Sequence, residues 1–87
     1  MEKKPLFDVT LQTLETHVRS VSTAANQAAI EQHGFVVVIC VQLLMEAALS
    51  DAEHQRVVSK IEELLTLPLD RATSEGLKGT LLALQQD

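Results

Sequence analysis

Apolar residues recur at steps of three and four along the first third of the chain, a spacing that brings their side chains to one face of a helix. The periodicity predicts a helix over about residues 5–33 that begins near Pro5, whose missing N–H costs little in a first turn. Propensity weakens between Ser20 and Thr23, because hydroxyl side chains compete for backbone hydrogen bonds. Whether the helix is continuous there is left open. Its apolar stripe consists of Phe7, Leu11, Leu14, Val18, Val21, Ala25 and Ala28, and the first five are the expected self-association stripe.

The next segment, FVVVICVQLLMEAAL from Phe35 to Leu49, is almost entirely apolar. Gly34 before it is typical of the residue just after a helix, because glycine enters the left-handed conformation without a Cβ penalty. Fifteen residues without a turn signal exceed the usual strand, so a second helix over about 35–50 is predicted. Gln42 and Glu46, four residues apart, should form one polar seam on an otherwise buried helix.

A membrane span is the alternative interpretation of this segment. A span needs about 20 mainly apolar residues, and here polar residues 31–34 precede the run while Ser50 and Asp51 follow it. We therefore predict a core helix and no membrane span.

Two further helices are expected after residue 50. Ser50 and Glu53 have the spacing of a capping box, which predicts a third helix over about 51–66, and Pro68 ends it or opens the next. The last helix, over about 69–86, has a leucine face and a side of small residues. These are Ala72, Gly76, Gly79 and Ala83, where another backbone could approach closely. The prediction is an all-α single domain over residues 1–87, a small bundle of about four helices.

Composition narrows the functions available to such a bundle. The chain has 87 residues and a net charge of −5, and its seven basic residues form no stripe that could neutralise a phosphate backbone, so no nucleic-acid partner is expected. A start of MEKKPLFDV without a following apolar run does not resemble a signal peptide. One cysteine allows no internal disulfide and fits a reducing, cytoplasmic compartment.

No set of residues predicts catalysis, a metal site or a cofactor. Cys40 lies between Ile39 and Val41 and is expected to be a buried apolar group with a raised pKa, not a nucleophile. The three histidines, at positions 17, 33 and 54, are far apart and have no Cys or Asp at ligand spacing, so each is predicted to lie at the surface or rim. The run Gly76 to Thr80 lacks the spacing of a phosphate-binding loop, and close helix packing is the better account of its glycines.

The apolar faces of the predicted helices exceed what one small chain can cover mutually, which favours a protein partner or a second copy. Three alternatives remain. A tidy monomer would bury every stripe, an acidic inhibitor would occupy a basic site on another protein, and a homodimer would pair the first-helix stripes as a coiled coil.

The run VICVQLLMEAALSDAEHQRVVSKIEELL, residues 38–65, resembles the helical hairpin of small tetratricopeptide-like chaperones of type III secretion needle subunits. It departs from the tetratricopeptide pattern at Met45, Val57 and Leu64, where small residues usually stand. The resemblance implies a cytoplasmic, non-enzymatic chaperone or adaptor whose second and third helices form an apolar groove for an amphipathic partner helix. The groove residues expected from the apolar pattern are Val41, Leu44, Met45, Ala48, Val57, Ile61 and Leu64.

Overall fold

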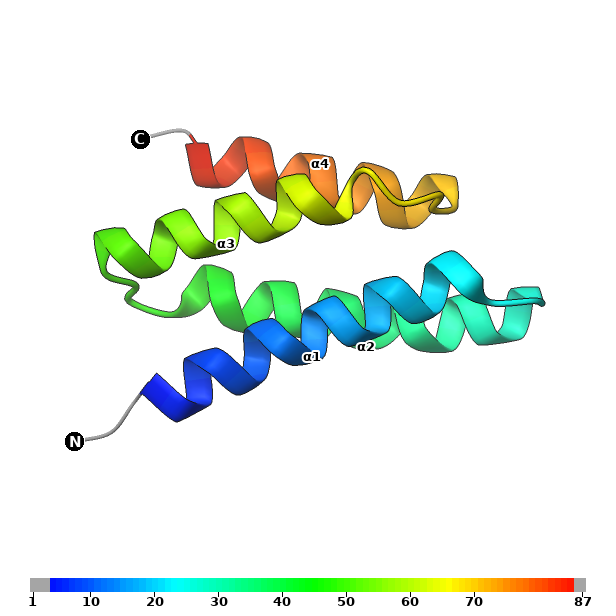
Figure 1. Cartoon of the computed structure of the whole chain (residues 1–87), viewed down its shortest axis with the longest axis horizontal. Coiled ribbons are helices and arrows are strands. Elements are labelled where there is room, and N and C mark those ends of the chain that lie inside the picture. Colours follow the sequence, from blue (N-terminus) through cyan, green and yellow to red (C-terminus); the bar gives the residue numbers. More distant parts are fainter. Residues whose placement is uncertain (1–3, 86–87) are drawn as a thin grey trace.

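The computed structural model describes residues 4–85 and consists of four α-helices: α1 (Lys4–Thr23), α2 (Gln27–Glu46), α3 (Asp51–Leu64) and α4 (Arg71–Gln85) (Figure 1). Among these residues there is no β-strand, so the predicted all-α fold with four helices is confirmed. The predicted end of the last helix, at residue 86, lies outside the described residues.

The helix expected over residues 5–33, whose continuity the sequence leaves open, is divided by a break between Thr23 and Gln27, and its second part belongs to α2. Asn26 is extended, with φ −142° and ψ 164°, and its side chain accepts a hydrogen bond of 2.8 Å from the Ala29 N–H, which starts a new helix. The break falls just after the stretch of weak helix propensity. Gly34, predicted to follow the end of the first helix, instead lies inside α2 without a positive φ.

The predicted capping box at the start of α3 is confirmed. The Ser50 Oγ accepts a hydrogen bond from the Glu53 N–H at 3.2 Å, and the Glu53 carboxylate accepts one from the Ser50 N–H at 3.0 Å. α3 ends at Leu64, two residues before the predicted end, and α4 begins at Arg71. Asp70 starts α4, since its Oδ2 accepts from the Thr73 N–H at 3.3 Å.

The four helices form two antiparallel hairpins, α1 with α2 and α3 with α4, that pack on one another. Figure 1 shows α1 beside α3 and α2 beside α4, and these are also the pairs whose backbones approach between the hairpins. The bundle measures 41 × 27 × 18 Å. Aliphatic side chains fill its centre, and the most deeply buried are Leu14, Val18, Val57, Ile61, Leu64 and Leu77.

Candidate partner-binding surface

The predicted groove between the second and third helices is not a surface of this bundle. Leu44, Val57, Ile61 and Leu64 are buried in the core, at no more than 4% exposure. Of the other expected groove residues, Val41 is half-buried, and Met45 and Ala48 are exposed. Helices α2 and α3 pack mainly against α1 and α4 and not against each other, so their predicted groove faces meet the bundle centre. The tetratricopeptide-like hairpin stays a prediction.

The predicted self-association stripe is also covered by its own chain. Its five residues, Phe7, Leu11, Leu14, Val18 and Val21, are at most 8% exposed. They face the bundle centre because the stripe has the 3.6-residue period of a helix that packs on two neighbours. Pairing of two copies through this stripe would require the bundle to open, so the stripe is not an available dimer surface.

Most of the large apolar side chains that remain exposed belong to α2, besides Leu6 and Val9 of α1 and Leu82 of α4. Five large side chains on its outer side are between 41% and 68% exposed: Phe35, Val38, Ile39, Leu43 and Met45. At 100° per residue these positions cluster on one half of the helix, and Gln42 and Glu46 lie in the middle of that half. The predicted polar seam exists, but it crosses an exposed apolar face instead of marking a buried helix.

The composition of α2 accounts for this excess. The helix has 20 residues, its most apolar stretch of 18 residues has a mean hydropathy of 1.7, and only 17% of that stretch is buried. By length and composition alone it could cross a membrane, a test that core helices of soluble proteins also pass. A helix that is apolar all round places half of its apolar residues outside whenever neighbours cover only one side.

A groove of about 630 Å³ runs between α2 and α4, beside this exposed face. Ile30, Phe35 and Val38 of α2 line it, and Ala72 and Leu77 of α4 lie opposite. The groove stays open because the facing positions hold small residues. A Cβ added to Gly34 would lie 4.0 Å from the Thr73 Oγ1, and one added to Gly76 would meet nothing within 4 Å.

The small-residue side of α4 is therefore not used for close packing within the described part of the chain. Gly76 and Gly79 are exposed, and a Cβ at either position would point into open space. The predicted role of these glycines in helix packing is wrong for the free bundle. Gly76 lines the groove, whereas Gly79 lies outside the lining.

Two carboxylates lie along the groove, and no Lys or Arg lines it. Glu31 accepts a hydrogen bond from the Gln27 side chain at 3.4 Å. Asp70 is part-buried and caps α4 through its Oδ2, while its Oδ1 is buried and has no hydrogen-bond partner. The charged groups of the groove are thus all negative.

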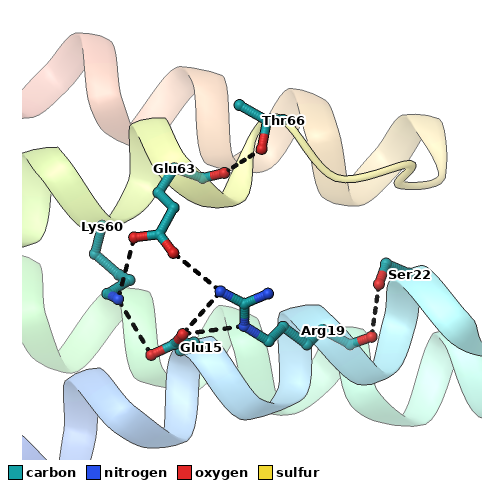
Figure 2. A network of polar contacts seen from close by, with 6 residues as sticks. All are labelled: Glu15, Arg19, Ser22, Lys60, Glu63 and Thr66. Atoms are coloured by element: carbon teal, nitrogen blue, oxygen red, sulfur yellow. Dashed lines mark hydrogen bonds and ion pairs between the residues drawn. The ribbon is translucent and has the colours of Figure 1, made fainter.

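On the opposite side, ion pairs bridge α1 and α3 (Figure 2). Arg19 of α1 contacts Glu15 and reaches across to Glu63 of α3, both at 3.0 Å. Lys60 of α3 contacts Glu15 at 3.2 Å and Glu63 at 3.3 Å. Hydrogen bonds from Arg19 and Lys60 lower the pKa of Glu15, and the hydrogen bond to Glu15 raises the pKa of Lys60.

Cys40 has the environment that the sequence predicts. It is 5% exposed, and burial raises the pKa of its thiol because the apolar surroundings disfavour a thiolate. The predicted raised pKa is confirmed.

The histidines lie at helix contacts that the sequence did not indicate. The Nδ1 atoms of His17 on α1 and His33 on α2 are 2.8 Å apart, and the Nε2–H of His54 donates to the Leu84 carbonyl at 2.7 Å. Each contact joins two helices of one hairpin. Within residues 4–85 no three His, Cys, Asp or Glu residues are grouped so as to hold a metal ion.

The fold and the surface together define a class: a small four-helix bundle with ion pairs along one side and an open apolar groove along the other. No protein-family description, curated protein or solved structure matches the chain.

Proposed function

We propose that the protein is a non-enzymatic chaperone or adaptor, cytoplasmic in location, that holds an amphipathic helix of a partner protein in the groove between α2 and α4. The observation that carries the proposal is the continuity of that groove with the exposed outer face of α2. The side chains of Phe35 and Val38 line the groove and are also part of the exposed α2 face.

The shape of the site suits a helix. Its α2 wall extends from Gln27 to Gln42, about 22 Å at ~1.5 Å per residue, and its α4 wall runs alongside from Asp70 to Thr80. Helix-in-groove recognition places apolar anchors at i, i+3, i+4 and i+7 between two such walls. Burying the exposed α2 side chains would also cover apolar surface that a soluble monomer rarely leaves in one patch.

The resemblance of residues 38–65 to needle-subunit chaperones supports the same general role. The binding residues differ from those expected from the apolar pattern, because four of those seven lie in the core. Val41, which lines the groove, and Met45, on the exposed α2 face, are retained from the earlier set. Phe35, Val38 and Gly76 take the place of the buried residues.

The test uses a designed peptide of about 18 residues, labelled with a fluorophore, whose leucines follow helical spacing and whose other positions are glutamine. Two variants are compared by fluorescence anisotropy, Gly76→Leu and Gly79→Leu. Both replace an exposed glycine of α4 by the same side chain, but only Gly76 lines the groove. Circular dichroism establishes that both variants keep the helical fold.

We expect Gly76→Leu to weaken peptide binding at least tenfold, because its side chain fills the groove, and Gly79→Leu to leave binding within about twofold of the unchanged protein. Equal affinity of the two variants would show that the peptide binds elsewhere. Absence of binding by the unchanged protein would refute the proposal for this groove.

A further inference from the structure

We infer that the partner helix is cationic, and that Asp70 is the residue that selects for it by accepting a hydrogen bond from a partner Lys or Arg. The inference rests on the proposed function and specifies the chemistry of its partner. Charge complementarity and one unsatisfied carboxylate oxygen carry it.

Asp70 is built into the groove by its position at the start of α4. Its Oδ2 is held by the Thr73 N–H, which fixes the side chain against α4. Its Oδ1 is buried without a hydrogen-bond partner, a state that costs free energy because the group has lost water and gained nothing in exchange. Asp70 as a whole is only part-buried and lines the groove, so a partner side chain that enters the groove meets this carboxylate.

A charged donor satisfies Asp70 better than a neutral one. Hydrogen bonds from Lys or Arg to a carboxylate are shorter and about twice as strong as neutral ones. The positive end of the α4 dipole lies nearby, but at about half a unit charge it is outweighed by the full charge of the carboxylate. Glu31 on the α2 wall adds a second negative charge along the same groove.

Four of the seven basic residues form ion pairs with carboxylates of the same chain. Arg19 and Lys60 bridge α1 and α3, Arg56 pairs with Asp8 at 2.9 Å, and Arg71 pairs with Glu75 at 3.1 Å. No basic residue lines the groove to neutralise Asp70 or Glu31. A cationic partner would therefore bring a charge that the groove itself lacks.

The same charges argue against a second copy of this chain as the occupant. A two-fold dimer brings the same patch of both subunits together. Asp70, Glu31 and the exposed Glu46 of one copy would then approach those of the other without a cation between them, and like charges in contact oppose association.

The test compares two peptides with the leucine stripe of the glutamine peptide, one carrying lysines and the other glutamates at the remaining positions. Their affinities are measured by anisotropy at low and moderate salt for the unchanged protein and for Asp70→Asn and Asp51→Asn. Asparagine is as good an N-cap as aspartate, so Asp70→Asn removes the charge and keeps the start of α4. Asp51 is a matched control, since it is an exposed aspartate in the first turn of α3, at the other end of the bundle (Figure 1).

We expect the lysine peptide to bind at least tenfold more tightly than the glutamate peptide and to lose affinity as salt rises. Asp70→Asn should weaken the lysine peptide about tenfold, and Asp51→Asn by less than threefold. Equal losses in the two variants would mean that only the overall negative charge matters, and the role of Asp70 would be wrong. If the lysine, glutamine and glutamate peptides all bound alike and Gly76→Leu blocked them all, the groove would be supported as the binding site and the inference of a cationic partner would be wrong.

A peptide-free control addresses self-association. Light scattering over a concentration series should give the mass of one chain throughout. A dimer that Gly76→Leu dissociates would replace the cationic helix with a second copy as the occupant of the groove.

Discussion

The two long sides of the bundle use the same architecture with opposite results. Between α1 and α3, long charged side chains cross the contact and pair (Figure 2). Between α2 and α4, the facing positions hold Gly34, Thr73 and Gly76, and the helices leave a groove. Neighbouring helices are thus bridged only where their side chains are long enough to meet.

The difference also separates stability from binding. Residues that bridge α1 and α3 contribute to the free energy of unfolding. The apolar residues of the outer α2 face contribute little to it, because they are exposed to water in the folded bundle. Substitutions in the core and between α1 and α3 should therefore change the free energy of unfolding, and substitutions in the groove should change the affinity for a helix.

Leu14→Ala should destabilise the protein by about 2–5 kcal/mol, because the side chain is completely buried and its loss leaves a cavity. Phe35→Ala removes a larger side chain that is 68% exposed and should change the free energy of unfolding by less than about 0.5 kcal/mol. Urea denaturation of both variants measures the contrast. Comparable losses would mean that the outer α2 face is buried in solution.

Val38→Glu should weaken binding of the glutamine peptide at least tenfold, about 1.4 kcal/mol, because a carboxylate would have to lose its water against the leucine stripe. Val38 is exposed in the free bundle, so its unfolding midpoint should hardly move. Glu62→Leu is the reverse control on α3, where an exposed position gains an apolar side chain away from the groove. That variant should leave peptide affinity unchanged, and a gain would indicate nonspecific apolar binding.

Gly79→Ala should stabilise the protein by about 0.5–1 kcal/mol, because alanine loses less backbone entropy than glycine in a helix interior. A Cβ at this position meets nothing within 4 Å, so no strain opposes the gain. Thermal unfolding measures the shift. A lower melting temperature would show that α4 packs more closely at Gly79 than the structure indicates.

Glu15→Gln should cost less than about 1 kcal/mol at neutral pH, because the ion pairs are partly exposed and screened. Hydrogen bonds from Arg19 and Lys60 lower the pKa of Glu15 in the folded state. The stability it contributes is therefore present above the pKa of an unfolded glutamate and is lost as pH falls through the lower folded value. The variant should show a shallower loss of stability from about pH 5 downward, and an unchanged acid limb would contradict the network.

The raised pKa of Lys60 acts at the other end of the pH scale. Its contribution is complete below the pKa of an unfolded lysine and is lost as pH rises through the higher folded value. Lys60→Met keeps much of the apolar stem. It should therefore reduce the loss of stability at alkaline pH, while the loss at acid pH, which depends mainly on Glu15, should change little.

Local signals in the sequence predicted local structure well. The capping box at Ser50 and Glu53 marks the start of α3 because its partners are three residues apart and need nothing else from the fold. The stretch of weak helix propensity from Ser20 to Thr23 lies next to the observed break, but the residue that caps the following helix is Asn26. The helix end predicted at Gly34 was wrong. Glycine ends a helix only where the chain needs a left-handed residue, and here Gly34 has an ordinary helical conformation.

The surface could not be predicted in the same way. α2 is apolar on nearly every side, so the pattern of apolar residues does not indicate which half of the helix faces inward. The answer depends on α1 and α4, which lie elsewhere in the sequence. For the same reason the groove residues of α4 and the contact between His17 and His33, which the antiparallel α1 and α2 bring together, had no local signal.

The most direct test of the open groove is a map of amide chemical shifts during titration of the isotope-labelled protein with the lysine peptide. The account predicts that the shifts gather along α2 from about residue 31 to 45 and along α4 from about 70 to 80, while the amides around Glu15 and Lys60 stay in place. Shifts concentrated on α1 and α3, or spread evenly over the bundle, would contradict it.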